Sequence, residues 1–156
     1  MIVLLAIVAF LVFVSAKHIR KLVVRYQKMM RGEWVKPLFS YTVPYGSHTI
    51  WVYTYDGSPL EGIALNTPFE LEVMPGECTM RSIYTPTVWT GIGALRYQGK
   101  MVGFMTDAGP RGEILTDLAK RHRHVFVYGN IRGHSTGGWP LVSVRVPSTT
   151  ELRKLR

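Results

Sequence analysis

The sequence predicts an N-terminal membrane helix followed by a mainly β domain, a small and partly open SH3/OB-like barrel with one inserted helix. Three observations lead to this prediction. The chain opens with an apolar run, from Met1 to Ala16. After residue 47 the apolar residues change from helical spacing to strand-like alternation. Fifteen glycines and nine prolines in 156 residues provide the turns that a barrel of short strands needs.

The apolar run is expected to be an uncleaved membrane anchor within residues 1–31. It contains no charged side chain, and Ser15 is its only polar residue. It is shorter than the roughly 20 residues that cross a bilayer core, so the helix would have to continue through Val24 with its lysines and arginines reaching the headgroups. Cations follow the run and none precedes it. This order predicts a single pass through the cell membrane, with the N-terminus outside and the C-terminal domain cytoplasmic.

The same run has two other interpretations. The segment Val14-Ser15-Ala16 contains the small residues that a signal-peptidase site requires, so the run could be a cleaved secretory signal. It could also be a helix buried inside the protein. The position of the cations favours the anchor over both.

A basic amphipathic helix is expected to follow the anchor. Apolar residues from Ile19 to Met30 recur at helical spacing, and most of the cations fall on the opposite side. An alternative is that these cations only set the membrane orientation, while the apolar stripe packs on the following domain. Each cation near an anionic membrane surface contributes about 1 kcal/mol, which makes five residues candidates for lipid binding: Lys17, Arg20, Lys21, Arg25 and Lys28.

Charge is distributed unevenly along the chain, whose net charge is +9. Residues 1–36 carry a net +6, residues 37–77 contain five acids and no lysine or arginine, and residues 78–156 carry a net +8. Arginine predominates in the last block, and its planar guanidinium suits phosphate. Cys78 is the only cysteine, which excludes an intrachain disulfide framework and fits a reducing compartment.

A connector over residues 32–47 is expected to lead into a barrel-like domain over residues 48–156. Gln98 and Gly99 are expected to form a hairpin turn, and residues 132–139 a glycine-rich loop. Alternation and turn residues predict the strands and one helix, with Pro110 in the first turn. The strands cover His48–Tyr55, Phe69–Val73, Met80–Tyr84, Ile92–Tyr97, Lys100–Met105, Val125–Ile131 and Leu141–Val146, and the helix covers Pro110–Arg121.

No arrangement of residues predicts catalysis, so we expect neither enzyme activity nor a cofactor. Cys78 has no partner that the sequence identifies, and residues 133–138 lack the lysine and the following helix of a phosphate-binding loop. His122 and His124 are the candidates for a metal site, but their spacing matches no zinc signature. We expect both histidines instead to extend a basic patch with Arg121 and Arg123, or to cap the C-terminus of the helix.

Aromatic residues alternate with arginines through the basic half of the chain, which is the more informative pattern. Proteins that bind single-stranded nucleic acid combine rings for base stacking with cations for the backbone. At least half of the rings are expected to lie in the barrel core instead. The candidates for nucleic-acid binding are Trp89, Arg96, Tyr97, Arg121, Arg123, Arg132 and Trp139.

One stretch of the chain combines the segment Gly93–Met105 (GALRYQGKMVGFM), a short helix near Leu115–Lys120 and the strand Val125–Gly129. Through these features, residues 91–130 resemble the HIRAN domain. The resemblance implies an SH3/OB-like barrel that captures DNA ends, usually single-stranded 3′ ends, within larger DNA-processing enzymes. The Asn-Pro-Tyr-Asp segment of that family should fall at Val88–Gly91, where this chain reads Val-Trp-Thr-Gly, so only Trp89 could supply a stacking ring there.

The sequence therefore predicts a membrane-anchored cytoplasmic binding module whose ligand is nucleic acid, as single-stranded DNA or DNA ends. The alternative is a structural or interaction protein that docks a partner protein or anionic lipid at the membrane surface. Steep salt dependence of single-strand binding would favour the first.

Overall fold

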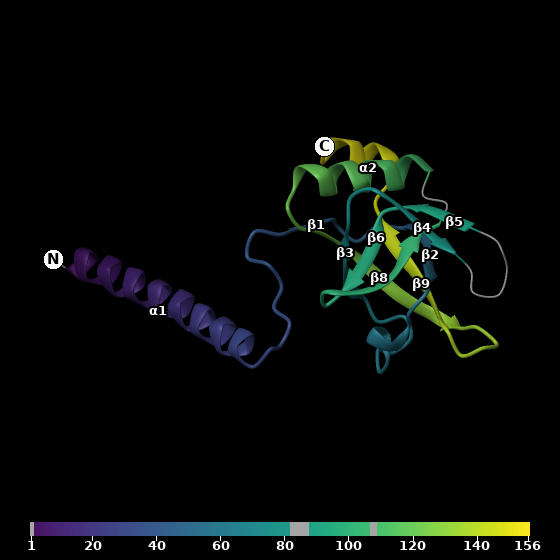
Figure 1. Ribbon diagram of the computed structural model, residues 1–156. Helices are drawn as coiled ribbons and strands as arrows, with labels where there is room; N and C mark the ends of the chain where they lie inside the picture. The colour runs from purple at the N-terminus through teal and green to yellow at the C-terminus, as the bar shows by residue number, and fades with distance from the viewer. Residues whose placement is uncertain (1, 82–87, 107–108) are drawn as a thin grey trace. The chain divides into compact units, whose positions relative to one another are not determined.

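The computed structural model describes the backbone of residues 2–81, 88–106 and 109–156, and the side chains of residues 5–76, 93–106 and 109–156. The chain forms two units, Met1–Lys36 and Pro37–Arg156. The second unit contains all the strands and is shown with the first in Figure 1.

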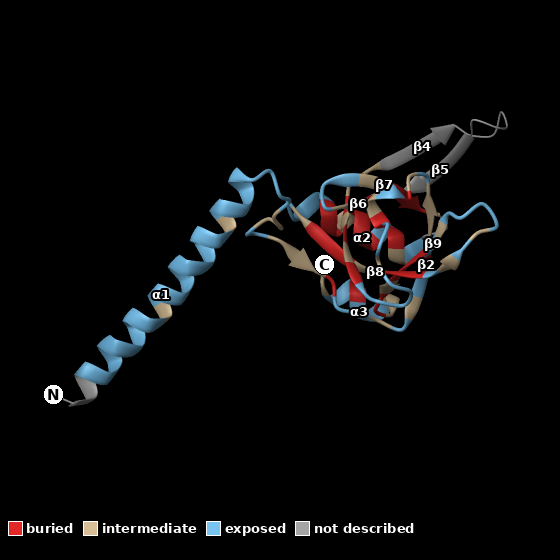
Figure 2. Ribbon diagram, turned by 90° about the horizontal axis from the view of Figure 1, so that it is seen from below, coloured by how far each residue is buried: buried red, intermediate tan, exposed pale blue. Residues whose placement is uncertain are grey.

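The first unit consists of one long helix, α1 (Ile2–Met30), and the residues that follow it. The continuous helix confirms the helical prediction for this segment. Its described apolar side chains are exposed except for half-buried Val14, and Figure 2 shows the helix mostly in pale blue. Among the residues that the structure describes, no helix has the length and apolarity to cross a membrane. The membrane anchor within residues 1–31 therefore stays a prediction.

The second unit is a small β-barrel, which confirms the barrel prediction at this level. Six antiparallel strands follow one another around it in the order β8-β3-β6-β7-β2-β9, and β9 pairs with β8 again. The expectation of a partly open barrel was therefore wrong, because the β8–β9 hairpin closes the sheet. The strands are β2 (His48–Thr54), β3 (Phe69–Val73), β6 (Ala94–Tyr97), β7 (Lys100–Met105), β8 (Val125–His134) and β9 (Pro140–Val146).

Three further strands lie outside this ring. The short strand β1 (Tyr41–Thr42) extends the sheet by pairing in parallel with the start of β8. The strands β4 (Glu77–Arg81) and β5 (Val88–Ile92) pair only with each other. Residues 82–84 of the predicted strand Met80–Tyr84 lie outside the described residues.

The barrel core follows from the alternation along its strands. Phe69, Leu71 and Val73 are buried while Glu70 and Glu72 are half-buried, as the period of two requires. In β9 the core receives Val142, Val144 and Val146. Residues of opposite parity therefore point outward, which places polar and aromatic side chains on the outer face of the barrel.

Two helices and one 3-10 turn cover the ends of the barrel. Helix α2 (Gly109–Arg121) packs against α3 (Thr149–Lys154), and both lie at one end of the barrel (Figure 1). The turn η1 (Ser58–Leu60) lies at the other end. Leu115, Leu118 and Leu152 are fully buried, so apolar contacts hold both helices on the barrel.

The structure differs from the sequence prediction in several elements. Strands β1 and β5 and helix α3 were not expected, and the second unit begins at Pro37, so residues 37–47 of the predicted connector belong to it. Strand β8 continues to His134, three residues beyond its predicted end. Its extra residues Gly133 and His134 pair with β9 after a bulge, so the expected loop is shorter.

Candidate binding surfaces

An exposed basic cluster lies where the C-terminal ends of α2 and α3 meet. We call it the α2–α3 cluster. Only two of its members, Arg121 and Arg123, were expected to bind a ligand as cations. All of its side chains are exposed: Lys120, Arg121, His122, Arg123, Arg153, Lys154 and Arg156.

Direct contacts hold part of this cluster together. The Arg121 guanidinium donates to the backbone carbonyl oxygen of Arg156 at 2.8 Å. Asp117 forms an ion pair with Arg156 and lies 3.8 Å from the Lys120 ammonium. Exposed ion pairs contribute about 0–1 kcal/mol to stability, so this carboxylate orders the cations without removing their excess positive charge.

His122 and His124 have different partners. The His122 ring stacks on Tyr41 with 5.3 Å between the ring centroids. The His124 Nδ1 atom lies 2.6 Å from an oxygen of Glu72. In the part of the chain that the structure describes, no three His, Cys, Asp or Glu side chains are grouped as metal ligands. The two histidines therefore fix the start of β8 against β1 and β3.

Arg96 and Tyr97 lie on β6, away from the α2–α3 cluster. Arg96 is half-buried, and its backbone lies opposite that of Glu72 in the β3–β6 ladder. The Tyr97 ring packs edge-on against Phe69, at 5.6 Å between centroids. Tyr97 is therefore part of the packing around the core, not a free stacking surface.

The remaining predicted residues lie elsewhere. Arg132 is seven residues beyond Val125 on β8, about 23 Å at ~3.3 Å per residue, and it donates to the Asn66 side-chain oxygen at 3.2 Å. Trp139 is the last residue of the β8–β9 loop, directly before β9. Trp89 lies in β5, and its side chain is outside the described residues. The described members of the predicted set are thus spread over both ends of the barrel.

A different aromatic surface lies on the outside of the barrel, over β8, β9 and β2. We call it the outer β8–β9–β2 face. Two cross-strand rows form it: Tyr128, Arg145 and Thr49 in one, and Asn130, Ser143 and Trp51 in the other. Asn130 and Ser143 are buried, so the second row is exposed only at Trp51. Trp51 is 54% exposed.

Tyr45 covers part of this face and orders it. Its ring centroid lies 5.8 Å from the Arg145 guanidinium carbon and 5.9 Å from the Tyr128 ring. The same guanidinium donates to the Thr49 hydroxyl at 2.7 Å. Tyr45 itself is 52% exposed. The face therefore presents two exposed rings, Trp51 and Tyr45, with an ordered arginine beside Tyr45, and rings with a nearby cation are what base stacking and backbone binding use.

The five lipid-binding candidates lie on α1. Lys17, Arg20, Lys21 and Lys28 are exposed, and Arg25 is half-buried. The first half of the helix exposes large apolar side chains at nearly every position, so they cover its whole circumference at ~3.6 residues per turn. These residues are Leu5, Ile7, Val8, Phe10, Leu11, Val12 and Phe13.

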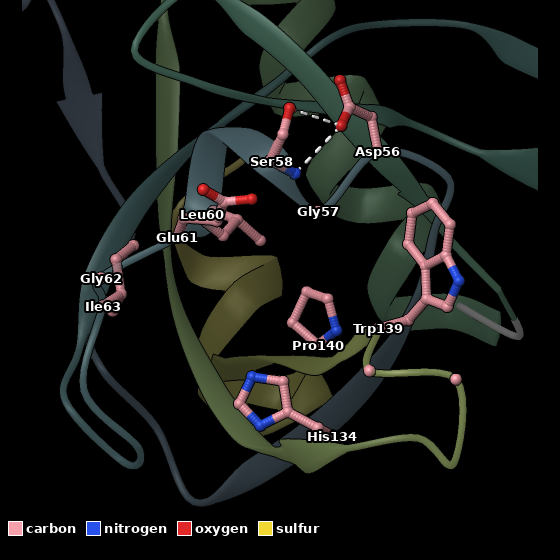
Figure 3. A pocket seen from close by; sticks show the side chains of 12 residues that line it. Asp56, Gly57, Ser58, Leu60, Glu61, Gly62, Ile63, His134, Trp139 and Pro140 are labelled. Atoms are coloured by element: carbon pink, nitrogen blue, oxygen red, sulfur yellow. Dashed lines mark hydrogen bonds between the residues drawn. The ribbon is translucent and has the colours of Figure 1, made fainter.

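A pocket of about 460 Å³ opens at the end of the barrel that holds η1. Figure 3 shows the carboxylates of Asp56 and Glu61 and the rings of His134 and Trp139 around it, with Pro140 between them. The lining thus carries two carboxylates and no lysine or arginine. This charge is opposite to that of the α2–α3 cluster.

Asp56 is held in its ionised form by the turn that follows it. Its Oδ1 atom accepts hydrogen bonds from the Ser58 hydroxyl at 2.7 Å and from the Ser58 backbone amide at 3.0 Å. The hydrogen bond from the Ser58 hydroxyl, followed by that from the Ser58 amide, holds the pKa of Asp56 below its usual value. Burial opposes these bonds with a smaller effect, and the charge of Lys100 lowers the pKa slightly further.

Sequence reasoning missed both the outer β8–β9–β2 face and the acidic side of the pocket. In the sequence, Asp56 and Ser58 have the character of turn residues. No local pattern indicates that they line a pocket together with Trp139, which is distant in the sequence. A usable signal did exist for the cations of α3. The capping-box pattern from Ser148 to Glu151 indicates the start of a helix, and this helix carries Arg153 and Lys154.

Comparison with protein-family models, curated proteins and solved structures finds no match to this chain.

Proposed function

We propose that this protein is a membrane-attached binding module and that α1 is its lipid-contacting element. The observation that carries the proposal is the all-round exposure of large apolar side chains from Leu5 to Phe13. A helix that is apolar on every side needs an apolar surrounding. The cations from Lys17 onward follow directly, so an anionic bilayer matches both halves of the helix.

The orientation expected from the sequence, with the cations on the cytoplasmic side, is part of this proposal. In that arrangement the second unit lies in the cytoplasm. The chain enters the barrel at β1, where the Tyr41 amide donates to the His124 carbonyl oxygen at 2.9 Å, beside the α2–α3 cluster. A second set of cations thus lies at the entry point, which supports anionic headgroups as the shared ligand.

Vesicle sedimentation tests the proposal with the full chain. We expect binding to vesicles that contain phosphatidylserine, and weaker binding to phosphatidylcholine alone. Changing Lys17, Arg20 and Lys21 to glutamine removes about 3 kcal/mol of attraction, roughly a 150-fold loss on the anionic vesicles. Arg132→Gln is the control for an exposed cation outside α1 and outside the α2–α3 cluster, and we expect little change.

The apolar half of the helix is tested separately. Phe10→Glu should weaken binding to both kinds of vesicle, because it places a carboxylate in hydrocarbon. Phe39→Glu is the matched control, since Phe39 is 89% exposed but lies outside α1. Equal sedimentation of the Phe10→Glu, Phe39→Glu and unchanged proteins would contradict the proposal.

A second candidate function is binding of single-stranded nucleic acid, and the outer β8–β9–β2 face is the observation that favours it. It exposes the Trp51 and Tyr45 rings, with Arg145 beside Tyr45, and the HIRAN-like resemblance with its SH3/OB-like barrel supports the same ligand. Fluorescence anisotropy of a labelled oligothymidylate at ~50 mM salt tests it. Trp51→Ala should weaken binding about 5-fold to 150-fold, since each stacked base contributes ~1–3 kcal/mol. Phe39→Ala is the control, and no binding by the unchanged protein rejects the candidate.

A further inference from the structure

We propose that the pocket between η1 and the β8–β9 loop binds the guanidinium group of an arginine presented by a partner protein. This inference is independent of the lipid and nucleic-acid proposals. It rests on the lining of the pocket, on the ordering of its walls, and on its position away from the basic surfaces.

The lining has the chemistry that a guanidinium requires. Trp139 lines the pocket and is 51% exposed as a residue, and indole is the strongest of the aromatic partners for a cation. Asp56 and Glu61 place carboxylates on the same pocket. Both Ser58 bonds end on Oδ1 of Asp56, and no other described residue bonds to this carboxylate, so its Oδ2 remains for a charge-assisted bond.

The walls of the pocket are ordered without a ligand. The Ser135 amide donates to the Trp139 carbonyl oxygen at 2.8 Å, and the Trp139 amide donates to the Ser135 hydroxyl at 3.1 Å. On the opposite wall, a Cβ atom on Gly57 would lie 2.6 Å from the Pro140 ring, so the η1 turn packs closely on β9. A preformed site avoids the entropic cost of ordering on binding.

The same geometry argues against phosphate in this pocket. Trp139 was predicted to stack on nucleic-acid bases, yet the pocket that it lines also carries two carboxylates, which repel a phosphate backbone. Lys100 is close enough to act on Asp56, but it does not line the pocket. Arginine fits better than lysine, because a planar guanidinium stacks on indole and donates to a carboxylate at once.

The volume points to an arginine within a polypeptide. About 460 Å³ lies within the range of sites that enclose small ligands, and it exceeds the space that one side chain fills. The chain on either side of the arginine would then occupy the remainder. Free agmatine, which has the same guanidinium but no peptide backbone, distinguishes a small-molecule source from a protein segment.

Calorimetric titration of the full chain tests the proposal with three probes. These are a capped Gly-Arg-Gly peptide, the same peptide with citrulline as the neutral isostere of arginine, and agmatine. We expect the arginine peptide to bind at least 10-fold more tightly than the citrulline peptide, and more tightly than agmatine. Equal binding of the arginine and citrulline peptides overturns the proposal, and tighter binding of agmatine overturns the assignment to a protein segment.

Variants place the binding in this pocket. Trp139→Leu should weaken the arginine peptide at least 5-fold, while Trp51→Leu, which removes another half-exposed tryptophan elsewhere on the barrel, should change nothing. Asp56→Asn keeps an oxygen for Ser58 and removes the charge, so it should also weaken binding. Unchanged affinity in both Trp139→Leu and Asp56→Asn, with unchanged thermal unfolding, would contradict the site. Displacement of the peptide by oligothymidylate in the Trp51→Leu variant would assign the pocket to nucleic acid and overturn the proposal.

Discussion

Gly103 illustrates how one residue determines the spacing of the barrel strands. It lies in the Val-Gly-aromatic part of β7, and a Cβ atom there would lie 2.1 Å from the Tyr53 backbone oxygen on β2. Alanine would therefore force the two strands apart. We expect Gly103→Ala to lower the free energy of unfolding by about 1–3 kcal/mol.

Urea unfolding measures this change, and the chain offers a matched control. Gly133 also lies in a strand, but no atom lies within 4 Å of its Cβ position. Gly133→Ala should leave the unfolding midpoint unchanged or raise it slightly, because alanine reduces the entropy of the unfolded chain. Equal destabilisation by the two substitutions would show that the close approach at Gly103 does not limit stability.

At the level of elements, the predictions succeeded where a local pattern was sufficient. Alternation in Phe69–Val73 and the turn before Lys100 gave β3 and β7 with the bounds found in the structure. Strand β1 has two residues and no pattern of its own, since it exists only through pairing with β8. The candidate surfaces depend even more on distant pairing, because Trp51 lies opposite Ser143, and Thr49 opposite Arg145, only when β2 pairs with β9.

Helix α3 is held by its N-cap and by one buried leucine. The Ser148 hydroxyl accepts a hydrogen bond from the Glu151 amide, and the Glu151 carboxylate accepts from the Ser148 amide at 2.9 Å. Ser148→Ala should cost about 1 kcal/mol of unfolding free energy. The matched substitution Thr150→Ala changes an exposed residue within the helix, and thermal unfolding should show little effect. A larger loss for Thr150→Ala would contradict the cap as the stabilising feature.

The same cap predicts a dependence on pH. Hydrogen bonds from the Ser148 hydroxyl and then its backbone amide hold the pKa of Glu151 below its usual value near 4.5. The stability that ionised Glu151 contributes is therefore present above that value and is lost as the pH falls through the lowered pKa. Unfolding at a series of pH values should show the difference between Glu151→Gln and the unchanged protein shrinking in acid. A difference that grows in acid would contradict the direction of the shift.

At the scale of the second unit, a basic cluster and a pocket lined by carboxylates lie at opposite ends of the barrel. Strand β8 runs from the α2–α3 cluster at Val125 to the pocket at His134, so cations gather at one end and Asp56 and Glu61 line the other. The acidic block of residues 37–77 therefore does more than neutralise the α2–α3 cluster, because two of its carboxylates line the pocket. In such a barrel, the basic end can face an anionic surface while the acidic end faces a cationic partner.

The division into two units gives a prediction for the whole chain. The described core residues lie between Val43 and Leu152, all within the second unit. A protein of residues 37–156 should therefore unfold at the same urea concentration as the full chain, and it should bind the arginine peptide equally well. A lower unfolding midpoint in the shortened protein would show that residues 1–36 stabilise the barrel, a role that their exposed side chains do not predict.

The shortened protein also tests which element contacts lipid. If α1 is the lipid-contacting element, the shortened protein should not sediment with phosphatidylserine vesicles. Full vesicle binding by the shortened protein would instead assign lipid contact to the α2–α3 cluster.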